Sequence, residues 1–277
     1  MIGVLGFDIH LYGLMIGLGM LAGGWVAARV AKLEGLDPDV VWDGLLWAGV
    51  LGIVGARLYH VADLWSYYST HVVEIVMVWN GGLGIFGGLL GGIVGISVWI
   101  YAKVFLGKKG NYKLQITNYK KELMRLLDLG ALGIPAGQAI GRWGNFFNQE
   151  LYGRPTSLPW GMFINPENRL PGLEQFSRFQ PLFLYESLLN LILFGLIALA
   201  YWKKSWKIGS GKYLGIYLIG YGAVRFVLEP LRVNNWQVGT VPMAWVFSIT
   251  AVILGIFLMQ GSYIPPKGRA GKKQNDK

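Results

Sequence analysis

Long apolar runs with almost no charge recur along the chain, separated by short polar or basic connections. They cover residues 9–28, 40–61, 82–105, 123–145, 182–202, 213–229 and 243–260. Each run is near the length of about 20 residues that an α-helix needs to cross about 30 Å of hydrocarbon. The runs are continuously apolar and do not alternate, so they are unlike the strands of a transmembrane β-barrel. The pattern predicts an all-α polytopic membrane protein with seven transmembrane helices, the first of them retained and not cleaved as a signal peptide.

The lysines lie on one side of this predicted arrangement. All 15 occur in or at the borders of alternate connections, near 29–39, 106–122 and 203–212, and in the tail 261–277. Short lysine-rich connections mark the cytoplasmic side of a membrane protein. We therefore expect the N-terminus outside, the C-terminus inside, and 261–277 as a basic cytoplasmic tail. The net charge of +10 is then an orientation signal and does not indicate a nucleic-acid partner.

The opposite side holds no lysine but most of the arginines. Arg142, Arg154, Arg169, Arg178 and Arg232 lie in or beside its connections, and Arg57 and Arg225 lie within apolar runs. Because the planar guanidinium can bind phosphate through two donors, arginine used alone favours a phosphate site, with simple tolerance or lipid headgroup contact as the alternative. The longest connection, 146–181, is rich in Pro, Gly and Asn. We expect it to be a small irregular outer segment or lid.

Composition narrows the chemistry further. The chain is 53% hydrophobic and contains no cysteine. The absence of cysteine excludes disulfides, thiolate metal sites and a cysteine nucleophile supplied by this chain. No connection is long enough to fold separately, so we expect residues 1–277 to form a single membrane-embedded domain.

The sequence 141-GRWGNFFNQELYGRPT-156 ends the fourth apolar run with a dense polar cluster. Arg142, Asn145 and Gln149 fall on one face if the helix continues, and Glu150 lies one position further round. Charge inside a membrane is costly, so such a face should line a cavity or pair with a neighbour. A structural ion pair, such as Arg142 with Glu150, is the alternative to a ligand site.

A second polar cluster lies in the sixth run, 221-YGAVRFVLEPLR-232. Tyr221, Arg225, Glu229 and Arg232 share a helical stripe at spacings of four, four and three. Arg225 and Glu229 can neutralise each other, which leaves Arg232 to hold an anion. Two arginine-bearing helix ends that face one cavity would form a good site for a phosphodiester.

Together, these clusters resemble the motifs of bacterial prolipoprotein diacylglyceryl transferases. The pattern G-R-x-G-N-F-x-N-x-E-x-x-G is filled by Gly141, Arg142, Gly144, Asn145, Phe146, Asn148, Glu150 and Gly153. Four further motifs are filled by His10, Tyr12 and Gly13, by Trp79–Gly82, by Pro181, Leu184, Tyr185 and Glu186, and by Gly220, Tyr221, Gly222, Arg225, Glu229 and Arg232. One position differs from the family pattern. Phe86 occupies a position at which some members of the family carry a histidine that is regarded as catalytically important. Either that histidine is not universal to the mechanism or this chain uses another group, and the intact state of the other motifs favours the first interpretation.

The resemblance implies a transfer reaction at the outer leaflet of the bacterial plasma membrane. The diacylglyceryl group of phosphatidylglycerol would move to the cysteine thiol of a prolipoprotein lipobox, with release of glycerol phosphate. The implied partners are phosphatidylglycerol, prolipoprotein signal peptides and membrane lipids, and neither a metal nor an organic cofactor is expected. A transporter or flippase for an anionic lipid or small anion is the alternative. It predicts charged residues across the whole membrane, whereas the intramembrane polar residues here cluster mostly in the outer half.

The motif positions give the expected site. The expected catalytic residues are Arg142, Arg225, Glu150, His10 and Tyr12. The expected substrate-binding residues are Asn145, Asn148, Gly153, Tyr221, Arg232, Glu229, Gly81, Gly82, Arg57 and Tyr185. The arginines would stabilise the leaving phosphate, and the thiol proton would go to Glu150, to His10 or, through water, to the phosphate itself. A purely structural role for Glu150, fixing Arg142 in place, is equally open.

Overall fold

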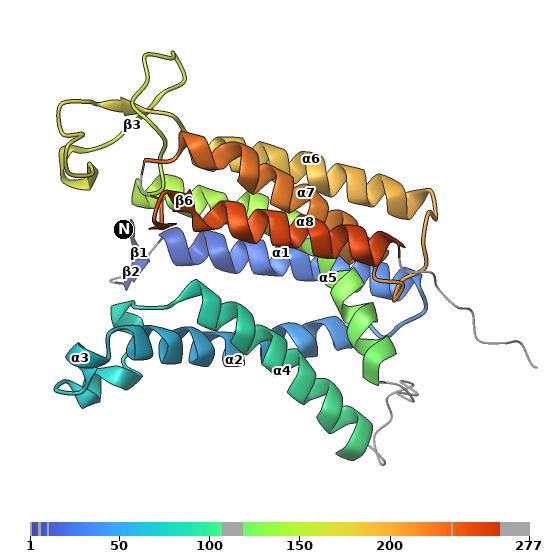
Figure 1. Ribbon diagram of the computed structural model, residues 1–277. Coiled ribbons are helices and arrows are strands. Elements are labelled where there is room, and N and C mark those ends of the chain that lie inside the picture. Colours follow the sequence, from blue (N-terminus) through green and yellow to red (C-terminus); the bar gives the residue numbers. More distant parts are fainter. Residues whose placement is uncertain (1, 5–6, 10, 107–118, 234, 261–277) are drawn as a thin grey trace, which may run out of the picture.

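Seven long helices dominate the computed structural model, which describes residues 2–4, 7–9, 11–106, 119–233 and 235–260 (Figure 1). They are α1 (Leu11–Leu33), α2 (Asp39–Asp63), α4 (Ile85–Leu106), α5 (Tyr119–Asn148), α6 (Leu182–Trp202), α7 (Lys212–Leu228) and α8 (Met243–Gln260). Each helix overlaps one of the seven predicted apolar runs, so the predicted helices are confirmed. His10 and the tail 261–277 lie outside the described residues.

Six of these helices are long and apolar enough to cross a membrane, among the residues that the structure describes. The exception is α5, which has Lys120, Lys121 and Glu122 in its first turn and Arg142 near its other end. Together with Arg125, Asp128 and Gln138 further along the helix, these charges lower the hydropathy of α5. The chain is thus a polytopic helical membrane protein with six candidate spans.

The long helices pack in close pairs: α1 lies along α5, α2 along α4, and α7 along α8. Small residues let their backbones approach closely. A Cβ added to Gly137 of α5 would collide with the carbonyl of Gly19 in α1. One added to Gly91 of α4 would collide with the carbonyl of Leu51 in α2. The α2–α4 pair lies as a separate layer beside the other five helices (Figure 1).

The start of α7 is fixed from α5 by a buried aspartate. The carboxylate of Asp128 accepts hydrogen bonds from the backbone N–H groups of Gly209 and Gly211, both at 2.9 Å, and of Leu214 at 3.0 Å. These bonds satisfy N–H groups at a helix start, which have no partner within the helix. Asp128 therefore anchors α7, the helix that carries Arg225 near its other end.

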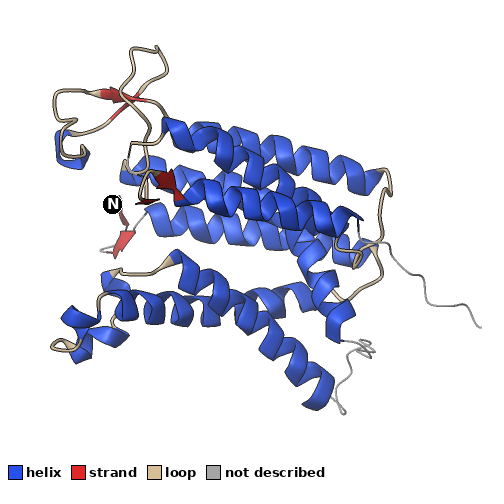
Figure 2. Cartoon of the chain, in the orientation of Figure 1, coloured by secondary structure: helices blue, strands red, loops and turns tan. Residues whose placement is uncertain are grey.

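Short elements fill the connections, mostly at the end of the bundle where α5 finishes (Figure 2). The list is β1 (Ile2–Val4), β2 (Phe7–Ile9), α3 (Trp65–Tyr68), η1 (Val72–Val76), η2 (Val78–Asn80), β3 (Met162–Phe163), η3 (Pro166–Asn168), β4 (Arg178–Phe179), η4 (Glu229–Leu231), β5 (Gln237–Val238) and β6 (Val241–Pro242). The strands pair antiparallel, β1 with β2, β3 with β4 and β5 with β6. Residues 152–181, here called the cap segment, contain β3, η3 and β4 and share a small core built around Tyr152, Ile164 and Phe179.

Candidate active site

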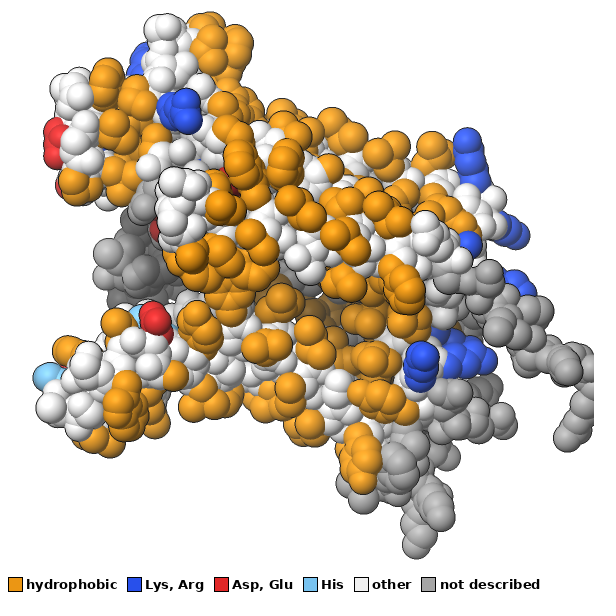
Figure 3. Space-filling model, viewed as in Figure 1, with side chains coloured by type: hydrophobic (Ala, Val, Ile, Leu, Met, Phe, Trp, Pro, Cys, Tyr) orange, Lys and Arg blue, Asp and Glu red, His pale blue; other side chains and the backbone are white. Residues whose placement is uncertain are grey.

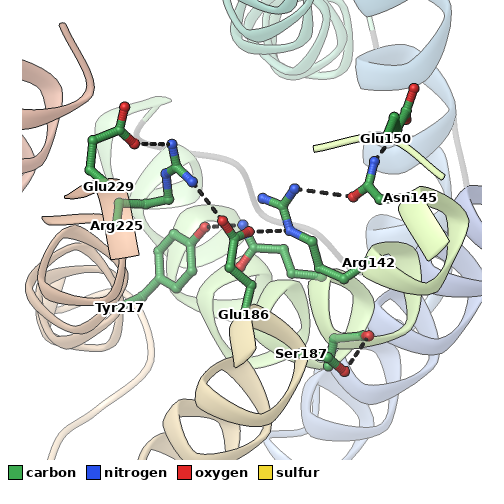
Figure 4. Close-up of polar contacts among 10 residues, drawn as sticks. Arg142, Asn145, Glu150, Glu186, Ser187, Tyr217, Arg225 and Glu229 are labelled. Atoms are coloured by element: carbon green, nitrogen blue, oxygen red, sulfur yellow. Dashed lines mark hydrogen bonds and ion pairs between the residues drawn. The ribbon is translucent and has the colours of Figure 1, made fainter. Parts of the chain in front are cut away.

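A buried glutamate joins the two arginine helices. The Nε of Arg142 on α5 makes an ion pair with Oε2 of Glu186 on α6, and Nη1 of Arg225 on α7 lies 2.6 Å from Oε1 of the same carboxylate. Figure 4 shows the two guanidinium groups reaching Glu186 from opposite sides. Glu186 is only 2% exposed. A buried charge is tolerated where opposite charges surround it, so the three helices are held together here by their charges.

A second carboxylate completes the surroundings of Arg225. Its Nη2 lies 3.0 Å from Oε2 of Glu229, the neighbour one helical turn away. The pair predicted from the sequence spacing is therefore present. Arg225 thus has a carboxylate on each side, which fixes the plane of its guanidinium.

Glu150 contacts the arginines through an amide and not directly. Arg142 Nη1 donates to Asn145 Oδ1 at 3.4 Å, and Asn145 Nδ2 donates to Glu150 Oε1 at 2.8 Å. Arg142 and Glu150 therefore do not form the direct ion pair that was the alternative to a ligand site. The helix α5 ends at Asn148. Gln149 consequently leaves the helical face on which the sequence pattern put it with Arg142 and Asn145.

The polar cluster closes one end of a cavity of about 870 Å³ between α1, α2, α4, α5 and α7. Tyr12, Arg142, Asn145, Tyr221, Arg225 and Arg232 line the polar end. Further along the cavity the lining is apolar, with Ile16, Met20, Leu45, Leu129 and Ile134 among its residues. Figure 3 shows the surface hollowed between the α2–α4 pair and the other helices. A cavity with one cationic end and a long apolar remainder has the shape and chemistry of a site for an anionic lipid.

Arg232 lines this cavity without an ion pair to any described carboxylate. Burial lowers the pKa of Arg232 from its ordinary value, and the nearby guanidinium of Arg225 lowers it further. Arginine starts from so high a pKa that it stays charged at neutral pH. Glu186 and Glu229 form ion pairs with Arg142 and Arg225, and Arg232 is the arginine of the cluster left to face an anion such as a phosphodiester.

Glu186 is the site residue that the sequence reasoning missed. The motif Pro181, Leu184, Tyr185 and Glu186 supplied Tyr185 as the expected ligand-binding residue, but the Tyr185 hydroxyl instead accepts a hydrogen bond from Trp160 Nε1 of the cap segment at 2.9 Å. The sequence did contain a feature that could have identified Glu186, namely an acidic residue inside an apolar run. A charge in a membrane helix needs a partner of opposite sign.

Arg57, Gly81 and Gly82 form a structural unit outside the cavity lining. Arg57 donates to the carbonyls of Ile75 at 2.8 Å, Gly81 at 2.8 Å and Gly82 at 3.1 Å, and also to that of Glu74. Arg57 thereby fixes the connection between α2 and α4. Both glycines have positive φ, 85° and 72°, which explains glycine at these positions.

Gly153 and Asn148 also lie away from the arginine pair. Gly153 donates its N–H to Gln180 O at 2.9 Å and pairs with Arg232 in an isolated β-bridge. A Cβ at position 153 would lie 3.0 Å from the carbonyl oxygen of Leu231, so glycine allows the cap segment to pack against η4. Asn148 is exposed as the last residue of α5. Within the described part of the chain, no group of three or more His, Cys, Asp or Glu side chains is placed to hold a metal ion.

Comparison with known proteins gives the family. The family model described as prolipoprotein diacylglyceryl transferase matches residues 1–260. A phosphatidylglycerol–prolipoprotein diacylglyceryl transferase of Fervidobacterium nodosum is 37% identical over 269 residues, which cover 97% of this chain and 85% of the relative. Proteins of the same name from Thermosynechococcus vestitus and Synechocystis sp. are 36% and 38% identical, over 91% and 90% of this chain and 88% and 84% of their own lengths.

The chain belongs to the prolipoprotein diacylglyceryl transferase family. The family indicated by the five sequence motifs is thereby confirmed. In this transferase the arginines of two motifs meet on a glutamate of a third, so motifs that lie far apart in the sequence form one site.

The position of Phe86 in this diacylglyceryl transferase leads to a first prediction. The ring centroid of Phe86 lies 5.5 Å from that of Trp236 and 5.0 Å from that of Phe247. Phe86 therefore packs α4 against α8 and against the connection that precedes α8. We expect Phe86→Ala to lower the melting temperature, because these contacts are lost, and to leave the transfer rate per folded molecule unchanged. Thermal unfolding and a lipid transfer assay measure the two effects. A lower rate with an unchanged melting temperature would mean that the ring takes part in the reaction.

Proposed function

We propose that the protein transfers the diacylglyceryl group of phosphatidylglycerol to the cysteine thiol of a prolipoprotein lipobox and releases glycerol phosphate. The observation that carries the proposal is the pair of arginines that share Glu186 at the polar end of an apolar cavity. The family membership of the chain supports the same activity. The names of the relatives give no support to the alternative of a transporter or flippase, since they are named as transferases.

The lipid would bind with its phosphate at the arginines and its acyl chains along the apolar part of the cavity. Arg142, Arg225 and Arg232 line one end of the cavity, and Arg232 is left to face the phosphate because Glu186 and Glu229 pair with the other two. Tyr12 and Tyr221 line the same end and would orient the headgroup. The acyl chains already lie in hydrocarbon in the bilayer, so their transfer into the apolar cavity gains little from the hydrophobic effect. The contacts of the phosphate with the arginines would therefore decide which lipid binds.

In the reaction, the substrate sulfur forms a bond to the terminal glyceryl carbon of the lipid while the bond from that carbon to the phosphate oxygen breaks. The bonding electron pair leaves with the oxygen, so negative charge develops on the phosphate. Arg142 and Arg225 are placed to stabilise that charge. We assign the thiol proton to Glu150, whose carboxylate accepts a hydrogen bond from Asn145 at the cavity lining. His10 and the departing phosphate remain the alternative acceptors.

For the membrane arrangement we propose seven spans, with α5 as the seventh, the N-terminus outside and the site near the outer leaflet of the bacterial plasma membrane. Support comes from the lysine distribution, since Lys32 lies in the last turn of α1 and Lys103 in the last turn of α4. Figure 3 shows basic side chains at both ends of the bundle, on the cap segment and at the opposite end, with apolar ones over the long helices between. Those of the cap segment are arginines, since residues 152–181 contain no lysine. The cap segment would then lie outside the membrane, where the prolipoprotein emerges.

A defined transfer assay tests the proposed function. Purified protein, phosphatidylglycerol and a lipobox peptide should yield a peptide whose mass is increased by one diacylglyceryl group on the cysteine, together with free glycerol phosphate. A peptide with serine in place of cysteine, and a reaction with phosphatidylcholine in place of phosphatidylglycerol, serve as controls. If folded protein yields no thioether product, the proposed function is wrong.

A further inference from the structure

The turn that follows α5 holds two residues in the left-handed region of the backbone. Gln149 has φ 51° and Leu151 has φ 53°. Residues with a Cβ seldom adopt this region, and asparagine and aspartate do so more often than glutamine or leucine. The two flank Glu150. A strained arrangement of this kind persists only where the surrounding contacts hold it in place.

The side chain of Gln149 supplies such contacts. Its Oε1 accepts a hydrogen bond from the backbone N–H of Asn165 at 2.8 Å and another from the side-chain amide of Asn168 at 3.1 Å. Both donors belong to the cap segment. The backbone N–H of Gln149 itself donates to Phe146 O at 3.1 Å. Gln149 therefore joins the end of α5 to the cap segment while its backbone stays left-handed.

The turn decides where the carboxylate of Glu150 points. The backbone N–H of Glu150 donates back to Asn145 O at 3.0 Å, and its Oε1 accepts from Asn145 Nδ2 at 2.8 Å. Both contacts require the chain to fold back over the last turn of α5, which the left-handed residue before Glu150 achieves. A helical or extended residue at position 149 would send the carboxylate away from Asn145 and from the arginine to which Asn145 is bonded.

We propose that Gln149 is a positioning residue for Glu150, through which the cap segment sets the place of the carboxylate that accepts the thiol proton. The proposal rests on the proposed function, and in particular on that role of Glu150. Gln149 acts without touching either substrate, because its own side chain is engaged by the cap segment. The lipid phosphate is held by arginines of α5 and α7, so the turn affects proton transfer and not lipid binding.

The main test is Gln149→Ala, which removes both bonds to the cap segment. We expect kcat to fall about tenfold, part of the 10²- to 10⁴-fold that a positioned base typically contributes, with KM for phosphatidylglycerol unchanged. In a background of Glu150→Gln the same substitution should have little further effect, because the carboxylate that it positions is gone. Transfer of lipid to a lipobox peptide, followed by mass, measures all four proteins.

Two further variants separate the contacts from other effects. Gln149→Asn keeps a residue that tolerates a left-handed backbone but is too short to make both bonds, so it should lose less activity than the alanine variant. A loss as large as that of alanine would mean that the bonds to the cap segment, and not the backbone conformation alone, place Glu150. Gln175→Ala is the matched control, since this glutamine of the cap segment bonds only to Gly172 O, at 3.4 Å. It should leave kcat unchanged. Melting temperatures of all variants confirm that they fold.

The outcomes distinguish the inference from the proposed function. If the losses from Gln149→Ala and Glu150→Gln multiply, or if KM rises while kcat is unchanged, Gln149 has a merely structural or binding role and the inference is overturned. Wild-type protein that transfers no lipid would overturn the proposed function itself. Should Gln149→Ala fail to fold, Asn168→Ala removes one of the same two bonds from the other side and is expected to lower kcat less, again with KM unchanged.

Discussion

Replacing Arg142 with lysine should lower the rate of diacylglyceryl transfer by about 100-fold or more, the loss typical of removing one anion donor from an active site. The guanidinium of Arg142 makes two contacts at once, from Nε to Glu186 and from Nη1 to Asn145. Lysine keeps the charge but ends in a single compact ammonium on a flexible chain. It cannot hold both partners and face the lipid phosphate at the same time.

The transfer assay with phosphatidylglycerol and a lipobox peptide measures this loss. Arg154→Lys is the matched control, because Arg154 is exposed on the cap segment. The control should transfer lipid at the wild-type rate and melt at the wild-type temperature. A wild-type rate in Arg142→Lys would contradict the two-donor role of Arg142 and would leave only its charge as the contribution.

The helices could be predicted because membrane spans need only length and apolar composition, both of which are local properties of the sequence. The run 123–145 shows the limit of that reasoning. Its helix extends to Tyr119–Asn148 and takes in the charged residues at both ends. The helix ends just before a left-handed residue, Gln149. Glycine at such a position can be recognised from the sequence as a helix end, whereas glutamine cannot.

Within the site, local pairs were predictable and long-range pairs were not. Arg225 and Glu229 are one helical turn apart, so their ion pair follows from spacing. The bridge from Arg142 to Arg225 through Glu186 joins three helices. It depends on how α6 packs against α5 and α7, which no local pattern encodes.

Arg57 was predicted to bind substrate but lies outside the cavity, and its local sequence could not have shown this. An arginine inside an apolar helix has the same local signature whether it binds a ligand or its own chain. The partners of Arg57 are the backbone carbonyls of residues 74, 75, 81 and 82, and these lie on the connection that the helix itself leads into. Only the folded path of that connection assigns Arg57 a structural role.

Replacing Glu186 with glutamine should lower kcat for transfer by about 100-fold while KM for phosphatidylglycerol does not rise. The carboxylate orients both Arg142 and Arg225, so its loss removes the fixed position of two anion donors and with it most of their effect on the transition state. Ground-state binding behaves differently. The site gains one unit of positive charge, which favours an anionic headgroup even though the arginines are less well placed.

Kinetic constants and melting temperatures separate these effects. Removing the carboxylate that two buried guanidinium groups share should also destabilise the fold, by up to about 3–5 kcal/mol, so rates are compared per folded molecule. Glu167→Gln, at an exposed position of the cap segment, should change neither constant. A raised KM with kcat unchanged would mean that Glu186 acts in binding the substrate. A fall in kcat at constant or lower KM follows only if the glutamate holds the arginines in the geometry that the leaving phosphate requires, since charge alone would have improved the site.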